Sequence, residues 1–194
     1  MIDTAMNTDA IQVRQARSDD RDRILALHLD AFGDDEGPVI VSLLEEMLDD
    51  PTAEPIYSFV AESEKKVVSH VLFTSVTIEP ARDSNDGANA QILAPLAVTR
   101  DLQGKGIGTQ LVNEALLTLS AAGVQVVFVL GYPKYYSRFG FVPAGVRGFQ
   151  APYPIPEKNA DAWMVVELQA DAVESLEGTV KCCAALDHQK YWVE

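Results

Sequence analysis

The most informative stretch of this sequence covers residues 103–109, which read Gln103-Gly104-Lys105-Gly106-Ile107-Gly108-Thr109. It follows a mostly apolar run at residues 91–98 and precedes apolar residues at helical spacing over residues 106–122. Glycines allow close approach of the backbone, and successive N–H groups at a helix start can hold phosphate oxygens. A strand, a glycine turn and a helix in this order predict a site for a phosphate-bearing ligand. A tight glycine turn without a ligand is the alternative that these residues leave open.

Two well-known phosphate loops do not fit this stretch. A Walker A loop requires glycine five residues before the Gly-Lys pair, where this chain has Thr99, and Ser or Thr after the lysine, where it has Gly106. The dinucleotide-binding fingerprint requires a third glycine at the position of Thr109. The turn therefore belongs to another class of phosphate site or to none.

The segments around the turn predict one mixed α/β domain. The length of 194 residues corresponds to roughly 1.3 domains of about 150 residues. We expect a flexible tail at residues 1–10, a domain over 11–168 and an extension of the same domain at 169–194. Apolar periodicity predicts strands at residues 11–14, 57–62, 67–78, 91–98, 125–130, 141–143 and 163–168, and helices at 18–33, 38–48, 106–122 and 134–139. An antiparallel hairpin should join the second and third strands, and residues 81–90 should form an exposed loop.

The charge of the chain limits its partners. There are 15 basic and 29 acidic residues, a net charge of −14, which argues against nucleic acid and against an anionic membrane surface. The acidity serves solubility in the simplest interpretation and favours a cationic substrate in the other. The two cysteines, Cys182 and Cys183, are adjacent and fit neither a stabilising disulfide nor a metal site. With no signal peptide and no membrane-spanning run, a cytoplasmic location is expected.

With the strand end Pro95-Leu96-Ala97-Val98 before it, the pattern Gln103-x-x-Gly106-x-Gly108 resembles the acyl-CoA signature of the GNAT superfamily of N-acetyltransferases. Three further segments are similar to a bacterial, YhbS-like branch of that superfamily: residues 69–73, 130–141 and 151–153. The resemblance covers roughly residues 11–168. It implies a GNAT fold with splayed central strands, here 91–98 and 125–130. A proline inside a central strand, Pro95, agrees with a bulge at that place.

The resemblance also implies acetyl-CoA as co-substrate, with no metal. The pantetheine arm would bond the backbone of Leu96 and Val98, the pyrophosphate would lie on the N–H groups of the glycine turn, and Lys105 would add charge at the rim. The cofactor-binding residues expected on this basis are Leu96, Ala97, Val98, Gln103, Gly104, Lys105, Gly106, Ile107, Gly108 and Thr109.

Tyr136, four residues before Gly140, matches the tyrosine that serves this family as general acid. Tyr135 competes for the same place, and a packing tyrosine is the structural alternative. No residue stands out as general base. Three glutamates qualify only by charge: Glu36, Glu62 and Glu79. His70 lies among apolar residues and is expected to be structural, while His28 and His188 have no partner at a telling spacing.

The reaction implied is transfer of an acetyl group to a primary amine of a small molecule or peptide, by a monomer or homodimer. The acidic run Asp34-Asp35-Glu36 lies between the first two predicted helices. The resemblance implies that this region borders the acceptor site, where the run would attract a cationic amine. A solvated loop is the alternative for that run. A non-catalytic acyl-CoA-binding module, acting as sensor or protein partner, is the alternative for the whole chain, and the sequence does not identify the acceptor.

Overall fold

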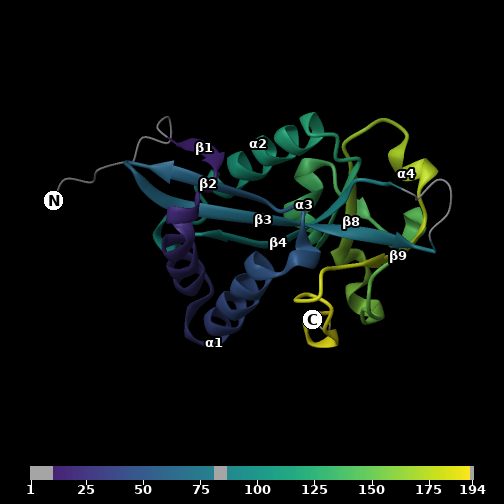
Figure 1. Cartoon of the computed structure of the whole chain (residues 1–194), viewed down its shortest axis with the longest axis horizontal. Helices are drawn as coiled ribbons and strands as arrows, with labels where there is room; N and C mark the ends of the chain where they lie inside the picture. The colour runs from purple at the N-terminus through teal and green to yellow at the C-terminus, as the bar shows by residue number, and fades with distance from the viewer. Residues whose placement is uncertain (1–10, 81–86, 193–194) are drawn as a thin grey trace.

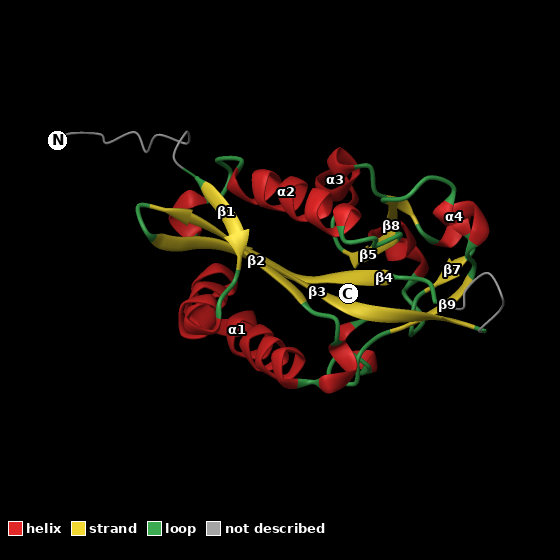
Figure 2. Cartoon of the chain, turned by 45° about the horizontal axis from the view of Figure 1, so that its top comes forward, coloured by secondary structure: helices red, strands yellow, loops and turns green. Residues whose placement is uncertain are grey.

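The computed structural model describes residues 11–80 and 87–192. The tail predicted for residues 1–10 and most of the loop predicted for 81–90 lie outside this part of the chain. Figures 1 and 2 show a long twisted sheet with one long helix on one face and two helices on the other. This arrangement confirms the predicted mixed sheet of an α+β protein.

Within the described residues the sheet has nine strands. Its main path runs β1-β2-β3-β4-β5-β8-β6, with the β4–β5 pair parallel and the other pairs on this path antiparallel. The strands are β1 (Gln12–Gln15), β2 (Tyr57–Ser63), β3 (Lys66–Glu79), β4 (Ala90–Val98), β5 (Val126–Leu130), β6 (Val142–Pro143), β7 (Phe149–Gln150), β8 (Trp163–Glu167) and β9 (Gly178–Lys181). The helices are α1 (Arg21–Asp49), α2 (Ile107–Ala121), α3 (Pro133–Tyr136) and α4 (Ala172–Ser175).

The sheet separates two apolar cores, because successive residues of a strand point to opposite faces. On one face, Leu44 and Met47 of α1 pack with Leu72 and Ile92. On the other, Leu111 and Leu119 of α2 pack with residues such as Phe73. The central strands β4 and β5 contribute residues to both cores, so they are packed on both faces.

The first two predicted helices form a single bent element, α1. Gly33 interrupts it with φ 74° and ψ −169°, a conformation that side chains with a Cβ rarely adopt. The bend separates the two halves at the position where the sequence predicted a helix end. It also brings the acidic run after Gly33 close to the C-terminal end of β4.

The predicted bulge and splay of the central strands are both present. The β3–β4 register passes from Val71–Leu96 to Phe73–Leu93, so β4 carries one extra residue beside Pro95. Pairing between β4 and β5 covers only Ala90–Ile92 with Val126–Phe128. In the described residues, the part of β4 from there to Val98 has no partner strand on this edge.

The C-terminal residues complete the α1-side core. β9 pairs with the far end of β3 through Ile78–Val180, and β7 pairs with β9. Trp192 is 1% exposed and packs against Trp163. The sequence did not predict β7 or β9, which are too short to show periodicity. In the described residues, no helix combines the length and the apolar character that crossing a membrane requires.

Candidate active site

The site begins at the open edge of β4. The Thr99 N–H donates to the Val68 carbonyl at 2.9 Å, so this facing pair is hydrogen-bonded. Hydrogen-bonded and non-bonded pairs alternate in an antiparallel ladder. The next bonded pair is therefore His70–Ala97, and the backbone groups of Leu96 and Val98 point away from β3, toward the splay. An extended ligand with amide groups can pair with them as a strand would.

The glycine turn is fixed to this edge by Gln103. Its Nε2 donates to the Val98 carbonyl at 3.1 Å, which leaves the N–H of Val98 and both backbone groups of Leu96 for a ligand. The Ala97 carbonyl instead accepts the Ser69 hydroxyl at 2.7 Å on the β3 side. Of the three strand residues predicted as cofactor contacts, Leu96 and Val98 thus offer backbone groups to the splay, whereas Ala97 offers them to β3.

The turn itself leads into the start of α2 with its N–H groups unused by any side-chain cap. Gly104 and Gly106 have φ values of 74° and 85°, and a Cβ at either would meet nothing within 4 Å. Ile107 is buried in the α2-side core, which anchors the helix start, while Lys105 is exposed. The first turn of a 15-residue helix with free N–H groups and open space in front of it favours an anion.

A cluster of three side chains lies against this helix start. The Tyr135 hydroxyl is hydrogen-bonded to Thr109, and a Cβ at Gly108 would lie 2.9 Å from that hydroxyl. The Arg138 guanidinium stacks over the Tyr135 ring at 4.7 Å, and its Nη1 lies 3.4 Å from Thr109 Oγ1. Within the described part of the chain, no carboxylate forms an ion pair with Arg138. A cation at a helix N-terminus is unfavourable by itself, so this position also favours an anion.

Tyr136 takes a different direction from its neighbour. It is 8% exposed, its ring packs against Phe141, and it lies on Gly131 at the end of β5. Burial raises the pKa of its phenol, so the group is protonated at neutral pH. The two adjacent tyrosines therefore lie in different places: Tyr135 lies at the start of α2, and Tyr136 lies at the end of β5.

The acidic run lies near the end of β4. The backbone N–H of Arg100 donates to the Asp30 carboxylate and its guanidinium to the Asp30 carbonyl, both at 2.9 Å. These bonds hold the bend of α1 against the residues that follow β4. Asp34, Asp35 and Glu36 come directly after the bend and are exposed.

Of the three glutamates named as bases by charge, Glu36 lies in the acidic run near the end of β4, whereas the other two lie away from the splay. Glu62 accepts a bond from Arg14 at 2.7 Å, and Glu79 lies at the other end of β3, beside β9. The structure instead joins two histidines that the sequence left separate. His28 Nε2 lies 2.8 Å from His70 Nδ1, and both residues are fully buried. Over residues 11–80 and 87–192, no group of three or more potential ligands is placed to hold a metal ion.

Comparison with known proteins gives a consistent result. Residues 12–144 match the family model described as "Acetyltransferase (GNAT) domain". The uncharacterized N-acetyltransferase YjhQ of Escherichia coli strain K12 is 43% identical over 154 residues, which cover 78% of this chain and 81% of that protein. The uncharacterized N-acetyltransferase YhbS of the same strain is 34% identical over 122 residues, 62% of this chain and 67% of YhbS.

Two solved structures share the fold. The crystal structure of YhbS from Escherichia coli in complex with CoA has a TM-score of 0.80 at 27% identity and covers 97% of this chain and 96% of its own. A GNAT family acetyltransferase from Brucella melitensis in complex with acetyl-CoA has a TM-score of 0.64 at 26% identity, with coverages of 91% and 98%.

Proposed function

This chain belongs to the GNAT family of acetyltransferases, and from that membership we propose that it transfers the acetyl group of acetyl-CoA to a primary amine. The observation that carries this proposal is the open edge of β4 leading directly into the unused N–H groups of α2. The edge suits a pantetheine amide, and the helix start suits a pyrophosphate. CoA and acetyl-CoA are bound in the two solved relatives, which supports the same ligand here.

We assign the cofactor contacts as follows. The backbone of Leu96 and Val98 pairs with the pantetheine arm, and Ala97 lines it without offering its backbone. The N–H groups of residues 104–109 hold the pyrophosphate, with Gln103 fixing the turn and Lys105 at the rim. Arg138, which the sequence did not single out, adds a cation beside Thr109.

The chemistry is direct attack of a neutral amine on the thioester carbonyl carbon. The C–N bond forms, the C–S bond breaks, and negative charge appears first on the carbonyl oxygen and then on sulfur. The Val98 N–H pairs with the pantetheine arm, so the neighbouring Leu96 N–H, which also points into the splay and lies farther from the glycine turn, is placed to stabilise the oxyanion. Tyr136 donates a proton to the thiolate, and its raised pKa keeps the proton on the phenol until then.

The acceptor in this proposal is a cationic amine, of a small molecule or a peptide. The acidic run after Gly33 is exposed at the end of β4 and adds to a net charge of −14. Such a field concentrates cations and speeds their arrival. We take residues 11–168 as the transferase domain and residues 169–194 as its extension, because β9 and Trp192 pack on the same sheet and core.

The experiment that tests the function measures CoA thiol release from acetyl-CoA with a panel of amines: polyamines, amino sugars, and peptides with a free N-terminus or lysine. Thiol release that depends on one class of amine supports the enzyme. Tight acetyl-CoA binding without release for any amine supports a binding module instead.

A further inference from the structure

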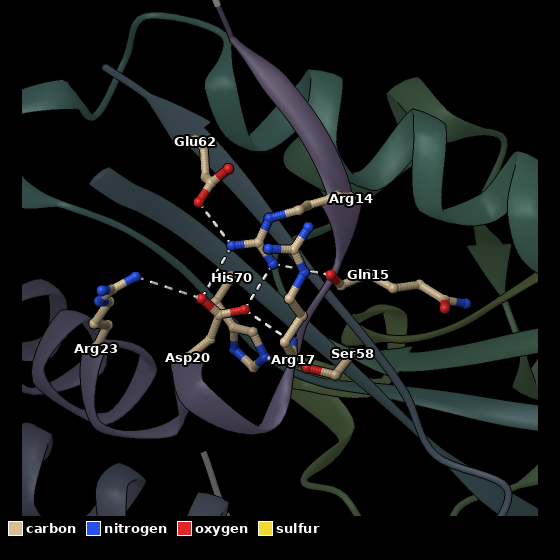
Figure 3. Close-up of polar contacts among 8 residues, drawn as sticks. All are labelled: Arg14, Gln15, Arg17, Asp20, Arg23, Ser58, Glu62 and His70. Carbon is tan, nitrogen blue, oxygen red and sulfur yellow. Dashed lines mark hydrogen bonds and ion pairs between the residues drawn. The ribbon is translucent and has the colours of Figure 1, made fainter. Parts of the chain in front are cut away.

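A row of four paired residues crosses the α1 face of the sheet from β1 to β4, and Figure 3 shows the polar contacts around two of them, Arg14 and His70. The strand register aligns Arg14 of β1, Val60 of β2, His70 of β3 and Ala97 of β4. Ala97 lies between the two residues whose backbone faces the splay. His70 is thus one strand away from the open edge of β4, on the face that α1 covers.

His70 belongs to a chain of three hydrogen-bonded side chains. Its Nδ1 lies 2.8 Å from Nε2 of His28, and its Nε2 lies 2.9 Å from the hydroxyl of Ser58. Among the described residues, Nδ1 of His28 has no hydrogen-bond partner, although it is buried. A polar atom buried without a partner is costly, so this nitrogen calls for a functional explanation.

The pattern of bonds selects one tautomer for each ring. A buried N–H without an acceptor is rarer than an acceptor without a donor. The free Nδ1 of His28 is therefore the bare nitrogen, and Nε2–H of His28 donates to His70. His70 then carries its proton on Nε2 and donates to Ser58, which is half-buried and leads toward solvent.

Two contacts place His28 over the end of β4. Through His70 it lies above Ala97, and two residues further along α1, Asp30 is bonded to Arg100 directly after β4. The His28 ring also stacks on Phe32, two residues before the acidic run. Its bare nitrogen is therefore in the layer between α1 and the sheet, on the side of the sheet that carries the acidic run.

We propose that His28 is the proton acceptor for the attacking amine, through one bridging water, and that His70 and Ser58 are positioning residues that hold it in the accepting tautomer. The inference rests on the proposed acetyl transfer and adds the base that the sequence did not reveal. As the C–N bond forms, one proton passes from the amine nitrogen through the water to Nδ1 of His28. After the amide leaves, His28 releases that proton to solvent; the sulfur has received its proton from Tyr136, which takes up one from solvent in turn, so no net proton is gained or lost.

The electrostatic surroundings agree with this role. Burial lowers the pKa of His28 to about 3 and that of His70 well below 6.5, so both rings are neutral at pH 7 and able to accept. The nearest buried carboxylate, Asp20, favours positive charge on His70, and Arg14 holds Asp20 while also pairing with Glu62. A weak base suffices, because the amine N–H becomes strongly acidic once the C–N bond has formed.

The first test compares His28→Asn with wild type, and with His188→Asn, an exposed histidine, as the matched control. We expect kcat/KM for the amine to fall about 10²-fold in His28→Asn, with the KM for acetyl-CoA within about twofold of wild type. The loss should shrink with rising pH, as hydroxide replaces the base. A folded His28→Asn protein with wild-type turnover at every pH would overturn the proposal and leave the pair as a structural contact.

The second test does not require a variant to fold or the enzyme to turn over. Nitrogen-15 NMR of the wild-type protein reports which ring nitrogen carries the proton. We expect a bare Nδ1 and a protonated Nε2 for His28. A proton on Nδ1 of His28 would overturn the assignment. Wild-type protein that binds acetyl-CoA but acetylates no amine would instead overturn the proposed function, whatever the tautomer.

Discussion

The ring of Tyr136 lies directly on Gly131, so closely that a Cβ at residue 131 would overlap the ring carbon Cε2. Gly131 follows the last residue of β5, and Tyr136 is the last residue of α3. The absence of a side chain at one residue thus sets the position of the phenol at the other.

Gly131→Ala should therefore displace the Tyr136 ring. We expect turnover to fall about tenfold or more, because a general acid must be within hydrogen-bond reach of the sulfur. Acetyl-CoA affinity should change little. The double variant with Tyr136→Phe is the sharper measurement: once the hydroxyl is gone, the alanine should cost little further turnover. Full additivity of the two losses would mean that Gly131 acts on something other than Tyr136.

Tyr136→Phe should lower kcat about 10²- to 10⁴-fold while leaving acetyl-CoA binding intact, since the phenol acts only as the thiolate forms. Tyr135→Phe is the matched control. It removes a hydroxyl bonded to Thr109 at the helix start, so its main effect should be on the KM for acetyl-CoA. Equal losses of kcat in both variants would contradict the separate roles of the two tyrosines.

Acetyl-CoA should stabilise the protein against heat. At a concentration 100 times the Kd, the gain is about 2.7 kcal/mol, which for this chain length is a rise in Tm of roughly 5–10 °C. Gly106→Glu should abolish the rise, because it adds bulk and negative charge where we propose that the pyrophosphate binds. A larger rise with ATP than with CoA would refute the cofactor assignment.

Arg138→Gln should weaken acetyl-CoA binding about tenfold, or ~1.4 kcal/mol, because a cation beside the pyrophosphate is lost. The control is Arg147→Gln, an exposed arginine in the segment between β6 and β7. Calorimetric titration measures both. Equal affinities for the two variants would show that Arg138 makes no contact with the cofactor.

Replacing Asp34, Asp35 and Glu36 with Asn, Asn and Gln should raise the KM for a cationic amine and reduce its dependence on salt. Salt screens exposed charges over about 8–10 Å, so wild-type KM for the amine should rise with ionic strength. The KM for acetyl-CoA, an anion, should stay constant or fall. If the three changes have no effect on the amine, the acidic run serves solubility only.

Stability should decrease in acid because of the buried histidine pair. The pKa of His28 is about 3 in the folded protein and 6.5 in the unfolded chain. Between these two pH values the unfolded chain therefore binds more protons than the folded protein. The contribution of the buried histidine to the free energy of unfolding is therefore fully present above about pH 6.5, and it decreases as the pH falls toward 3. Each histidine contributes a slope of about 1.4 kcal/mol per pH unit.

Urea unfolding at a series of pH values measures that slope. His28→Asn should remove its share of the slope between pH 6 and 4 and leave that of His70, and His188→Asn should leave the slope unchanged. A wild-type stability that stays constant over this interval would show that the pair is not held neutral by burial.

The sequence by itself determined the features that depend on residues close together in the chain. Gly104 and Gly106 specify the turn because their positive φ is a local requirement, and Gln103 reaches Val98 only five residues away. Pro95 marks the bulge because a missing N–H disturbs the ladder wherever the strand lies. These local signals predicted the strand, turn and helix of the proposed cofactor site, and the similarity to the GNAT family, confirmed by the family match, placed them in one fold.

Only the tertiary structure decided which distant residues meet. His28 and His70 are 42 residues apart, and Thr109 and Arg138 are 29 apart, so neither pair has a spacing that periodicity can detect. Their contacts depend on how α1 lies across β3 and how the turn after α3, at Ser137–Phe139, lies against the start of α2. The different positions of Tyr135 and Tyr136 have the same origin, because the two adjacent side chains diverge toward different glycines, Gly108 and Gly131, which leave room for them.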